Sequence, residues 1–232
     1  MCGRFCLTIS EVKKLADRFR VEQPILPLPV RPRYNIAPTQ NVLVVARKDG
    51  GTTLMEMRWG LIPYWAKDAA IGGKLINARA ETLAEKPSFR EALETRRCLI
   101  PSDGFYEWKQ LAGGKQPFRI GLEGGALFAF AGLWDTWIDP VTRIPVLSCT
   151  IITCAPNPMM QEIHDRMPVI LKPEDEVRWL AGTPGEARLL LVPFAGARLI
   201  CCPTRCVPKS LRSRVDTGRG PLLCCLPLAP VR

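Results

Sequence analysis

Short runs rich in β-branched and aromatic residues recur along this chain, and glycine-containing turns separate several of them. The runs cover residues 41–47, 52–59, 98–101, 104–109, 117–122, 126–133 and 146–153. Residues 49–51, 113–114 and 124–125 contain the glycine pairs that favour tight hairpin turns. The regular alternation of strands and helices that builds a parallel sheet does not occur. The sequence therefore predicts an α+β fold, with a mainly antiparallel sheet forming an open β-barrel-like core and flanking helices.

Three amphipathic segments are the candidates for the flanking helices. They cover residues 8–20, 84–95 and 173–181. Thr8 or Ser10 could cap the first of them. Pro87 falls near the first turn of the second, where proline is tolerated. A chain of 232 residues fits one large domain or two small ones and is long enough to bury a full hydrophobic core.

The last part of the chain differs in composition from the rest. Residues 198–232 hold seven arginine and lysine residues against one aspartate, out of a net charge of +10 for the whole chain. From Leu199 onward neither a helical nor a strand period is visible, and repeated prolines oppose regular structure. We therefore interpret residues 1–200 as the folded domain and residues 201–232 as an aberrant Cys/Pro/Arg-rich tail. Disorder and a shifted reading frame near Cys202 are the two explanations for that tail.

Composition and hydropathy also constrain the cellular location of the protein. Hydrophobic residues make up 47% and charged residues 23%, as in soluble globular proteins. No apolar run approaches the roughly 20 residues that a membrane-spanning helix needs, and the start of the chain lacks the pattern of a signal peptide. We expect a cytoplasmic protein, in the bacterial cytosol or associated with the nucleoid, that does not act on a membrane.

The chain has ten cysteines and a single histidine, His164. A reducing compartment argues against a disulfide framework. Five of the cysteines fall in the last 32 residues and no CxxC pair occurs, so the sequence gives little support to a zinc site. A cysteine-only metal site in the tail stays open as an alternative. For the folded domain we expect no metal and no cofactor.

Cys2 directly follows Met1. Once Met1 is removed, Cys2 carries an amine and a thiol on adjacent carbons. The amine can condense with an aldehyde to a Schiff base, and the thiol can close that adduct to a thiazolidine ring. The same residue can also act as an N-terminal nucleophile with its own amine as the base. Ordinary pKa values of about 8 for the amine and about 8.5 for the thiol suit this chemistry near neutral pH, and a nearby cation such as Arg4 would favour the thiolate.

Four further segments combine polar residues with small or aromatic neighbours. Asn77 and Arg79 lie two positions apart, Glu107 sits among three aromatic residues, His164 is the only imidazole, and residues 33–38 form a polar and aromatic loop. An aromatic surrounding raises the pKa of a carboxyl toward the range useful for acid–base catalysis. Taken singly, each feature also fits an ordinary role, as a turn residue, a solvated strand position or an incidental histidine.

Together these segments match a known family. The motifs MCGRF, RYNIAP, WGLIP-W, INARAET, PSFREAL, GFYEW and HDRMPVIL occur here in one order, and this order resembles the SOS response-associated peptidase (SRAP) family from Met1 to about Trp179. The resemblance implies a β-barrel-like core. It also implies covalent capture of abasic sites in single-stranded DNA, through a thiazolidine crosslink to Cys2 after removal of Met1, which protects the lesion during the DNA damage response.

The resemblance also assigns roles to individual residues. Cys2 would form the crosslink, Asn77 would hold its amine and the opened sugar, Glu107 would act as acid and base, and His164 would promote ring opening or reversal. The expected DNA contacts are Arg4, Pro38, Trp65, Arg79, Lys86 and Arg90, with Trp65 as a base-stacking wedge. Many members have two successive tryptophans where this chain has Trp65 and Ala66.

Two other functions remain alternatives at this point. One is an N-terminal-nucleophile cysteine peptidase with autoprocessing activity, although only Met1 precedes Cys2 and an ordinary methionine aminopeptidase should remove it. The other is a non-catalytic nucleic-acid-binding module. For the preferred function, a DNA–protein crosslinking and lyase-like enzyme, we expect a monomer whose partner is single-stranded DNA with abasic sites.

Overall fold

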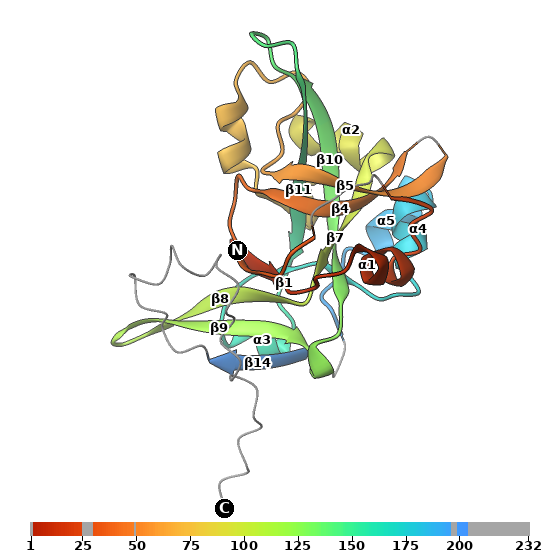
Figure 1. The fold of residues 1–232 in the computed structure, drawn as a ribbon. Coiled ribbons are helices and arrows are strands. Elements are labelled where there is room, and N and C mark those ends of the chain that lie inside the picture. The colour runs from red at the N-terminus through yellow and green to blue at the C-terminus, as the bar shows by residue number, and fades with distance from the viewer. Residues whose placement is uncertain (1, 25–29, 49, 196–198, 204–232) are drawn as a thin grey trace, which may run out of the picture.

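Five strands form a closed barrel at the centre of the computed structural model, which describes residues 2–24, 30–48, 50–195 and 199–203 (Figure 1). These strands are β4 (Asn41–Lys48), β5 (Gly51–Trp59), β7 (Arg97–Ser102), β10 (Phe128–Ile138) and β11 (Pro145–Cys154). Antiparallel pairs join β5 to β4, β4 to β7, β7 to β10 and β10 to β11. The parallel pairs Ser148↔Arg58 and Cys149↔Trp59 then join β11 back to β5. The α+β class and the barrel-like core are confirmed, but the barrel is closed where an open one was expected.

Four very short strands extend the sheet that forms the barrel. They are β2 (Gln23–Pro24), β6 (Asn77–Arg79), β12 (Met167–Pro168) and β13 (Ile170–Leu171). β6 runs parallel to β11, with Asn77 opposite Ile151 and Arg79 opposite Thr153. β12 lies antiparallel to β11, with Pro168 also opposite Thr153. The segments that carry Asn77 and the motif around His164 therefore lie on the two sides of the same stretch of β11.

A second sheet lies below the barrel in Figure 1. Among the described residues it has the order β14 (Leu199–Pro203), β9 (Gly114–Leu122), β8 (Gly104–Leu111), β1 (Arg4–Leu7) and β3 (Arg33–Ile36). Aromatic contacts join it to the barrel, because the ring of Phe5 lies 5.1 Å from that of Trp59 and the ring of Phe105 lies 6.0 Å from that of Phe130. β14 crosses the domain boundary expected at residue 200, and residues 204–232 of the expected tail lie outside the described residues.

Short helices surround the barrel. They are α1 (Val12–Arg18), α2 (Pro87–Thr95), α3 (Pro158–Gln161), α4 (Glu176–Ala181) and α5 (Pro184–Leu189), with 3-10 turns η1 (Ala69–Lys74), η2 (Ala80–Thr82) and η3 (Glu123–Gly125). The first helix begins later than the expected residue 8, because the backbone N–H and hydroxyl of Thr8 donate to Asp103 and do not cap the helix. α2 begins at Pro87, since a residue before proline is held in an extended conformation.

Candidate functional site

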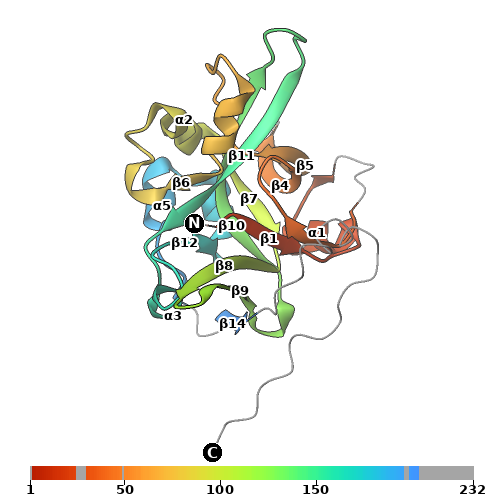
Figure 2. The ribbon, with the colours of Figure 1, turned by 90° about the vertical axis from the view of Figure 1, so that its left-hand side faces the viewer.

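The start of the chain runs alongside β8. Arg4, Phe5 and Cys6 pair antiparallel with Tyr106, Phe105 and Gly104. Continuing this register toward the N-terminus places Gly3 and Cys2 beside the part of β8 that contains Glu107 and Trp108. Figure 2 looks onto this side of the molecule, where β1 enters between β8 and the strands of the barrel. The pairing of β1 with β8 therefore brings Cys2 and Glu107 together, although more than 100 positions separate them in the sequence.

Cys2 has no exposed surface. Its thiol donates a weak hydrogen bond to the carbonyl oxygen of Arg4, with 3.8 Å between sulfur and oxygen. Burial, and then the negative charge of Glu107, raise the pKa of this thiol well above its ordinary value. The guanidinium of Arg4 instead donates to Asn35 Oδ1 at 3.2 Å. Burial therefore acts against the thiolate that a nearby cation such as Arg4 was expected to favour.

Glu107 is a buried carboxyl, with only 2% of its surface exposed. Alternation along β8 turns Phe105 and Glu107 inward, while Trp108 is exposed. Burial raises the pKa of Glu107, and the positive charges of the chain's N-terminal amine and of His164 act in the opposite direction. A carboxyl of this kind holds its proton to higher pH than a solvated glutamate and can donate it to a reacting group.

His164 follows α3 and lies within electrostatic range of Glu107. Its backbone N–H donates to Met160 O at 2.8 Å. On the ring, Nδ1 accepts from the backbone N–H of Arg166 at 3.0 Å and lies 2.7 Å from Asp165 Oδ1. The first contact suits the neutral imidazole with its proton on Nε2, and the second suits the protonated ring. Nδ1 therefore has both a donor and an acceptor within hydrogen-bond distance.

Asn77 is the first residue of β6. A series of contacts through Trp59 and Phe5 connects its segment to β1. Its side-chain Nδ2 donates to Ile76 O at 3.1 Å, and the indole N–H of Trp59 donates to the same oxygen at 2.9 Å. The ring of Trp59 in turn packs on Phe5 of β1. The buried Oδ1 of Asn77 accepts no hydrogen bond within the described part of the chain. A buried acceptor of this kind is available to a donor from a bound molecule.

Arg166 is a residue of this site that sequence analysis did not single out. Its guanidinium binds both carboxylate oxygens of Glu81, at 2.6 and 2.9 Å, and also Thr153 O at 2.7 Å. These hydrogen bonds hold the pKa of Glu81 below its ordinary value. They also fix the segment that carries His164 against β11 and η2. The signal was present in the sequence, because two of the quoted motifs, INARAET and HDRMPVIL, carry residues of opposite charge.

The expected DNA contacts are less closely grouped. Arg79 lies at the end of β6. Pro38 lies in a turn that is held against the end of β5, because the N–H of Thr39 donates to Trp59 O at 2.8 Å. Lys86 and Arg90 are exposed at the first turn of α2. Trp65 is 46% exposed on the loop between β5 and η1. Of the six expected contacts, Arg4 follows Cys2 closely on β1, Arg79 and Pro38 lie on segments that adjoin β11 and Trp59, and Lys86, Arg90 and Trp65 lie farther along the chain on α2 and on the loop after β5.

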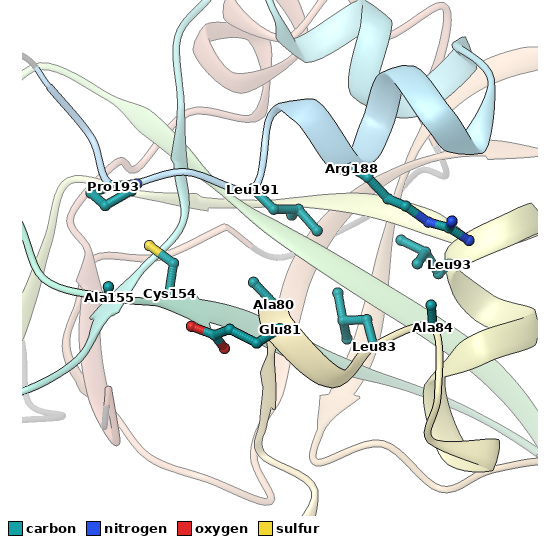
Figure 3. A pocket seen from close by; sticks show the side chains of 10 residues that line it. All are labelled: Ala80, Glu81, Leu83, Ala84, Leu93, Cys154, Ala155, Arg188, Leu191 and Pro193. Atoms are coloured by element: carbon teal, nitrogen blue, oxygen red, sulfur yellow. The ribbon is translucent and has the colours of Figure 1, made fainter.

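A pocket of about 330 Å³ includes Glu81, the partner of Arg166, in its lining (Figure 3). Glu81 and Cys154 line its side toward β11, and Arg188 and Leu191 come from α5 and the residues that follow it. Burial raises the pKa of the Cys154 thiol to about 11, so this thiol is a weak nucleophile at neutral pH. Cys2, Glu107 and His164 do not line this pocket.

Two further observations concern the described part of the chain. It contains no group of three histidine, cysteine, aspartate or glutamate residues that could hold a metal ion. None of its helices has the length and apolar character needed to cross a membrane.

Several known proteins are similar to this chain in sequence or in fold. The chain is 52% identical to abasic site processing protein YoqW of Bacillus subtilis over 84% of this chain and 88% of the relative. It is 32% identical to abasic site processing protein YedK of Escherichia coli over 78% and 79%. A crystal structure of a protein from Bacteroides thetaiotaomicron superimposes with a TM-score of 0.80 at 28% identity, over 88% of this chain and 92% of that one. Residues 1–207 match the family described as SOS response associated peptidase (SRAP), and the chain belongs to this family.

Proposed function

We propose that this protein processes abasic sites in single-stranded DNA by forming a covalent crosslink through Cys2. The observation that carries the proposal is the burial of Cys2 next to Glu107, a carboxyl whose pKa is raised, within electrostatic range of His164. Relatives named as abasic site processing proteins, up to 52% identical to this chain, support the choice of substrate. An abasic site exists partly as an open-chain aldehyde, the functional group that an amine next to a thiol captures.

The first step joins the amine of Cys2 to the aldehyde carbon. Removal of Met1 frees this amine, which adds to the carbonyl and forms a carbinolamine. Glu107 then donates its proton to the hydroxyl group, which leaves as water, and a Schiff base remains. The raised pKa of Glu107 supports this role, because a protonated carboxyl must be available near neutral pH.

The second step closes the ring. The nitrogen of the Schiff base keeps its proton, and the thiol of Cys2 adds to the adjacent carbon to form a carbon–sulfur bond. The proton of the thiol passes to the carboxylate that Glu107 became in the first step, which restores the carboxyl. The product is a five-membered thiazolidine, and no oxidant or reductant is needed. The buried position of Cys2 also keeps water away from the Schiff base before the ring closes.

Asn77 and His164 have supporting roles in this proposal. The buried Oδ1 of Asn77 is an acceptor for the amine of Cys2 or for a hydroxyl of the opened sugar. His164 exchanges a proton during opening of the sugar ring or during reversal of the crosslink. Its two partners for Nδ1, the backbone of Arg166 and the carboxylate of Asp165, suit this exchange.

The proposed DNA contacts come from several elements. Arg4, Arg79, Lys86 and Arg90 would bind phosphates, which give affinity but carry little sequence information. Trp65 would stack on a base, and Pro38 would lie close to the lesion. Basic residues combined with an exposed aromatic side chain are the usual elements of sequence-tolerant binding to single strands.

The experiment that tests the proposal compares the protein with its Cys2→Ser variant on single-stranded DNA that contains one abasic site. With Met1 removed, the protein should give an adduct that survives heating on a denaturing gel. Cys2→Ser should give an adduct only after borohydride reduction, because its amine still condenses but its hydroxyl does not close a stable ring. A heat-stable adduct from Cys2→Ser without reduction, or none from the unaltered protein, would refute the mechanism.

A further inference from the structure

Two neighbouring aromatic side chains, Tyr64 and Trp65, are exposed on the loop that leaves β5. They are 57% and 46% exposed, whereas residues 61–63, directly before them, are buried. Exposed aromatic groups on a segment that is otherwise packed into a fold often mark a binding surface. Tyr64 is the more exposed of the two, and the mechanism proposed above gives it no role.

The backbone of this loop is held at alternate residues by side chains of the barrel. Ser148 Oγ accepts from the N–H of Ile62 at 2.8 Å, Asp135 Oδ2 accepts from the N–H of Tyr64 at 3.0 Å, and the indole of Trp137 donates to the carbonyl oxygen at position 66 at 2.7 Å. The backbone that carries Tyr64 is therefore fixed before any ligand arrives. A group fixed in advance loses little conformational entropy on binding.

Both ends of the loop lie at the proposed site. It begins after Trp59, whose ring packs on Phe5, and the N–H of Leu61 donates to Leu75 O at 3.1 Å. The chain then continues directly to Asn77. A ligand that occupies the site around Cys2 and extends along the molecule can therefore meet this loop.

The charges beside the aromatic pair favour a polyanion. Lys67 and Lys74 are both exposed. The acidic residue between them, Asp68, is engaged as the cap of η1 and accepts from the N–H of Ala70 at 2.8 Å. Aromatic faces next to exposed cations suit single-stranded nucleic acid, whose bases stack while its phosphates are neutralised.

We propose that Tyr64 is a second base-stacking residue, which receives a nucleobase near the lesion in addition to the base assigned to Trp65. The proposal rests on the proposed function for the identity of the ligand. In a DNA strand that lacks one base, the bases on either side of the gap have lost a stacking partner. An aromatic side chain can replace that partner, and alanine substitution at such a position lowers affinity by roughly 5- to 150-fold.

The test uses single-stranded oligonucleotides with a tetrahydrofuran analogue of the abasic site, which has no aldehyde and cannot crosslink. Each carries 2-aminopurine, whose fluorescence is quenched by stacking, at one position near the analogue. Affinity is measured by fluorescence anisotropy. Tyr64→Ala should weaken binding about 5-fold or more and change the fluorescence at one position. Tyr64→Phe and Tyr64→Trp should bind within about 2-fold of the unaltered protein. Leu189→Ala, which removes a 72% exposed side chain on α5, is the control and should change neither signal.

Two results would overturn the inference. One is binding by Tyr64→Ala within about 2-fold of the unaltered protein, with unchanged fluorescence at every labelled position. The other is loss of binding by Tyr64→Phe and Tyr64→Trp as well, since both keep an aromatic face. A crosslinking assay on a true abasic site, run with the unaltered protein, separates this inference from the proposed function. If the unaltered protein forms no crosslink, the covalent mechanism is refuted, and the binding data alone decide whether Tyr64 stacks on a base.

Discussion

At the scale of single residues, the site combines groups that are costly to bury. Glu107 is a carboxyl in an apolar interior and Cys2 is a fully buried thiol. The motifs around these residues were visible in the sequence, as was the aromatic surrounding of Glu107. The burial that raises the pKa of the Cys2 thiol was not visible, because it depends on how β1 packs against β8, which local sequence does not reveal. For Arg166 the motifs carried a signal in their opposite charges, but the pairing itself depends on the fold, since Glu81 and Thr153 are distant from Arg166 in the chain.

Glu107→Gln tests the catalytic role of this carboxyl. Glutamine keeps the size of the side chain but has no acidic proton to give to the leaving water. We expect crosslinking to slow by about 10²- to 10⁴-fold, with the affinity for an uncleavable abasic analogue nearly unchanged. Single-turnover crosslinking and anisotropy measure the two quantities. A rate within a few-fold of the unaltered protein would remove Glu107 from the chemistry.

The same substitution should increase stability at neutral pH. The folded state raises the pKa of Glu107, so it binds a proton more readily than the unfolded chain does, and stability falls as pH rises from the ordinary value toward the raised one. Glutamine mimics the protonated carboxyl at every pH. Urea unfolding should show Glu107→Gln more stable than the unaltered protein at pH 7.5, and the difference should shrink at pH 4. Glu56→Gln, at an exposed position of β5, is the control. An equal difference at both pH values would contradict this account.

At the scale of elements, β11 organises the site because short strands join both of its edges. β6 brings Asn77 and Arg79, and β12 follows the segment that carries His164. The long strands and α2 were predictable from alternating and helical periodicity. Strands of two or three residues have no period of their own and form only where a partner strand is already in place. β14 was not expected for a different reason: it has five residues and pairs with β9, but it begins at Leu199, where the sequence shows no strand period.

Arg166→Lys tests how the segment around His164 is held. Lysine keeps the positive charge but cannot form the paired hydrogen bonds to Glu81 together with the bond to Thr153. We expect a loss of about 1 to 2 kcal/mol in the free energy of unfolding and a several-fold slower crosslinking rate. Arg188→Lys, whose bond to Glu94 lies at the surface, is the matched control and should cost well below 1 kcal/mol. Equal effects of the two variants would show that Arg166 has no special positioning role.

At the scale of the whole molecule, closing the barrel brings the start of the chain against the centre of the fold. The α+β class followed from strand spacing and turn signals, whereas closure depends on the parallel contact between β5 and β11, which joins segments about 90 positions apart. The net charge of +10 is also a property of the whole chain, and seven of its basic residues lie in residues 198–232. DNA binding through residues of the folded domain and DNA binding through total charge therefore predict different salt dependence once the basic tail is removed.

Salt dependence distinguishes these two modes of binding. With three or four phosphate contacts among Arg4, Arg79, Lys86 and Arg90, the slope of log K against log salt for single-stranded DNA should be roughly −2 to −3. Arg79→Ala should make the slope shallower by about 0.7, the share of one contact, and Lys48→Ala, at the far end of β4, should leave it unchanged. A chain that ends at Pro203 should keep most of the slope, because the four cations all lie in the body. If the slope disappears in the shortened chain, the basic residues beyond Pro203 account for binding, and the phosphate contacts assigned to the body are wrong.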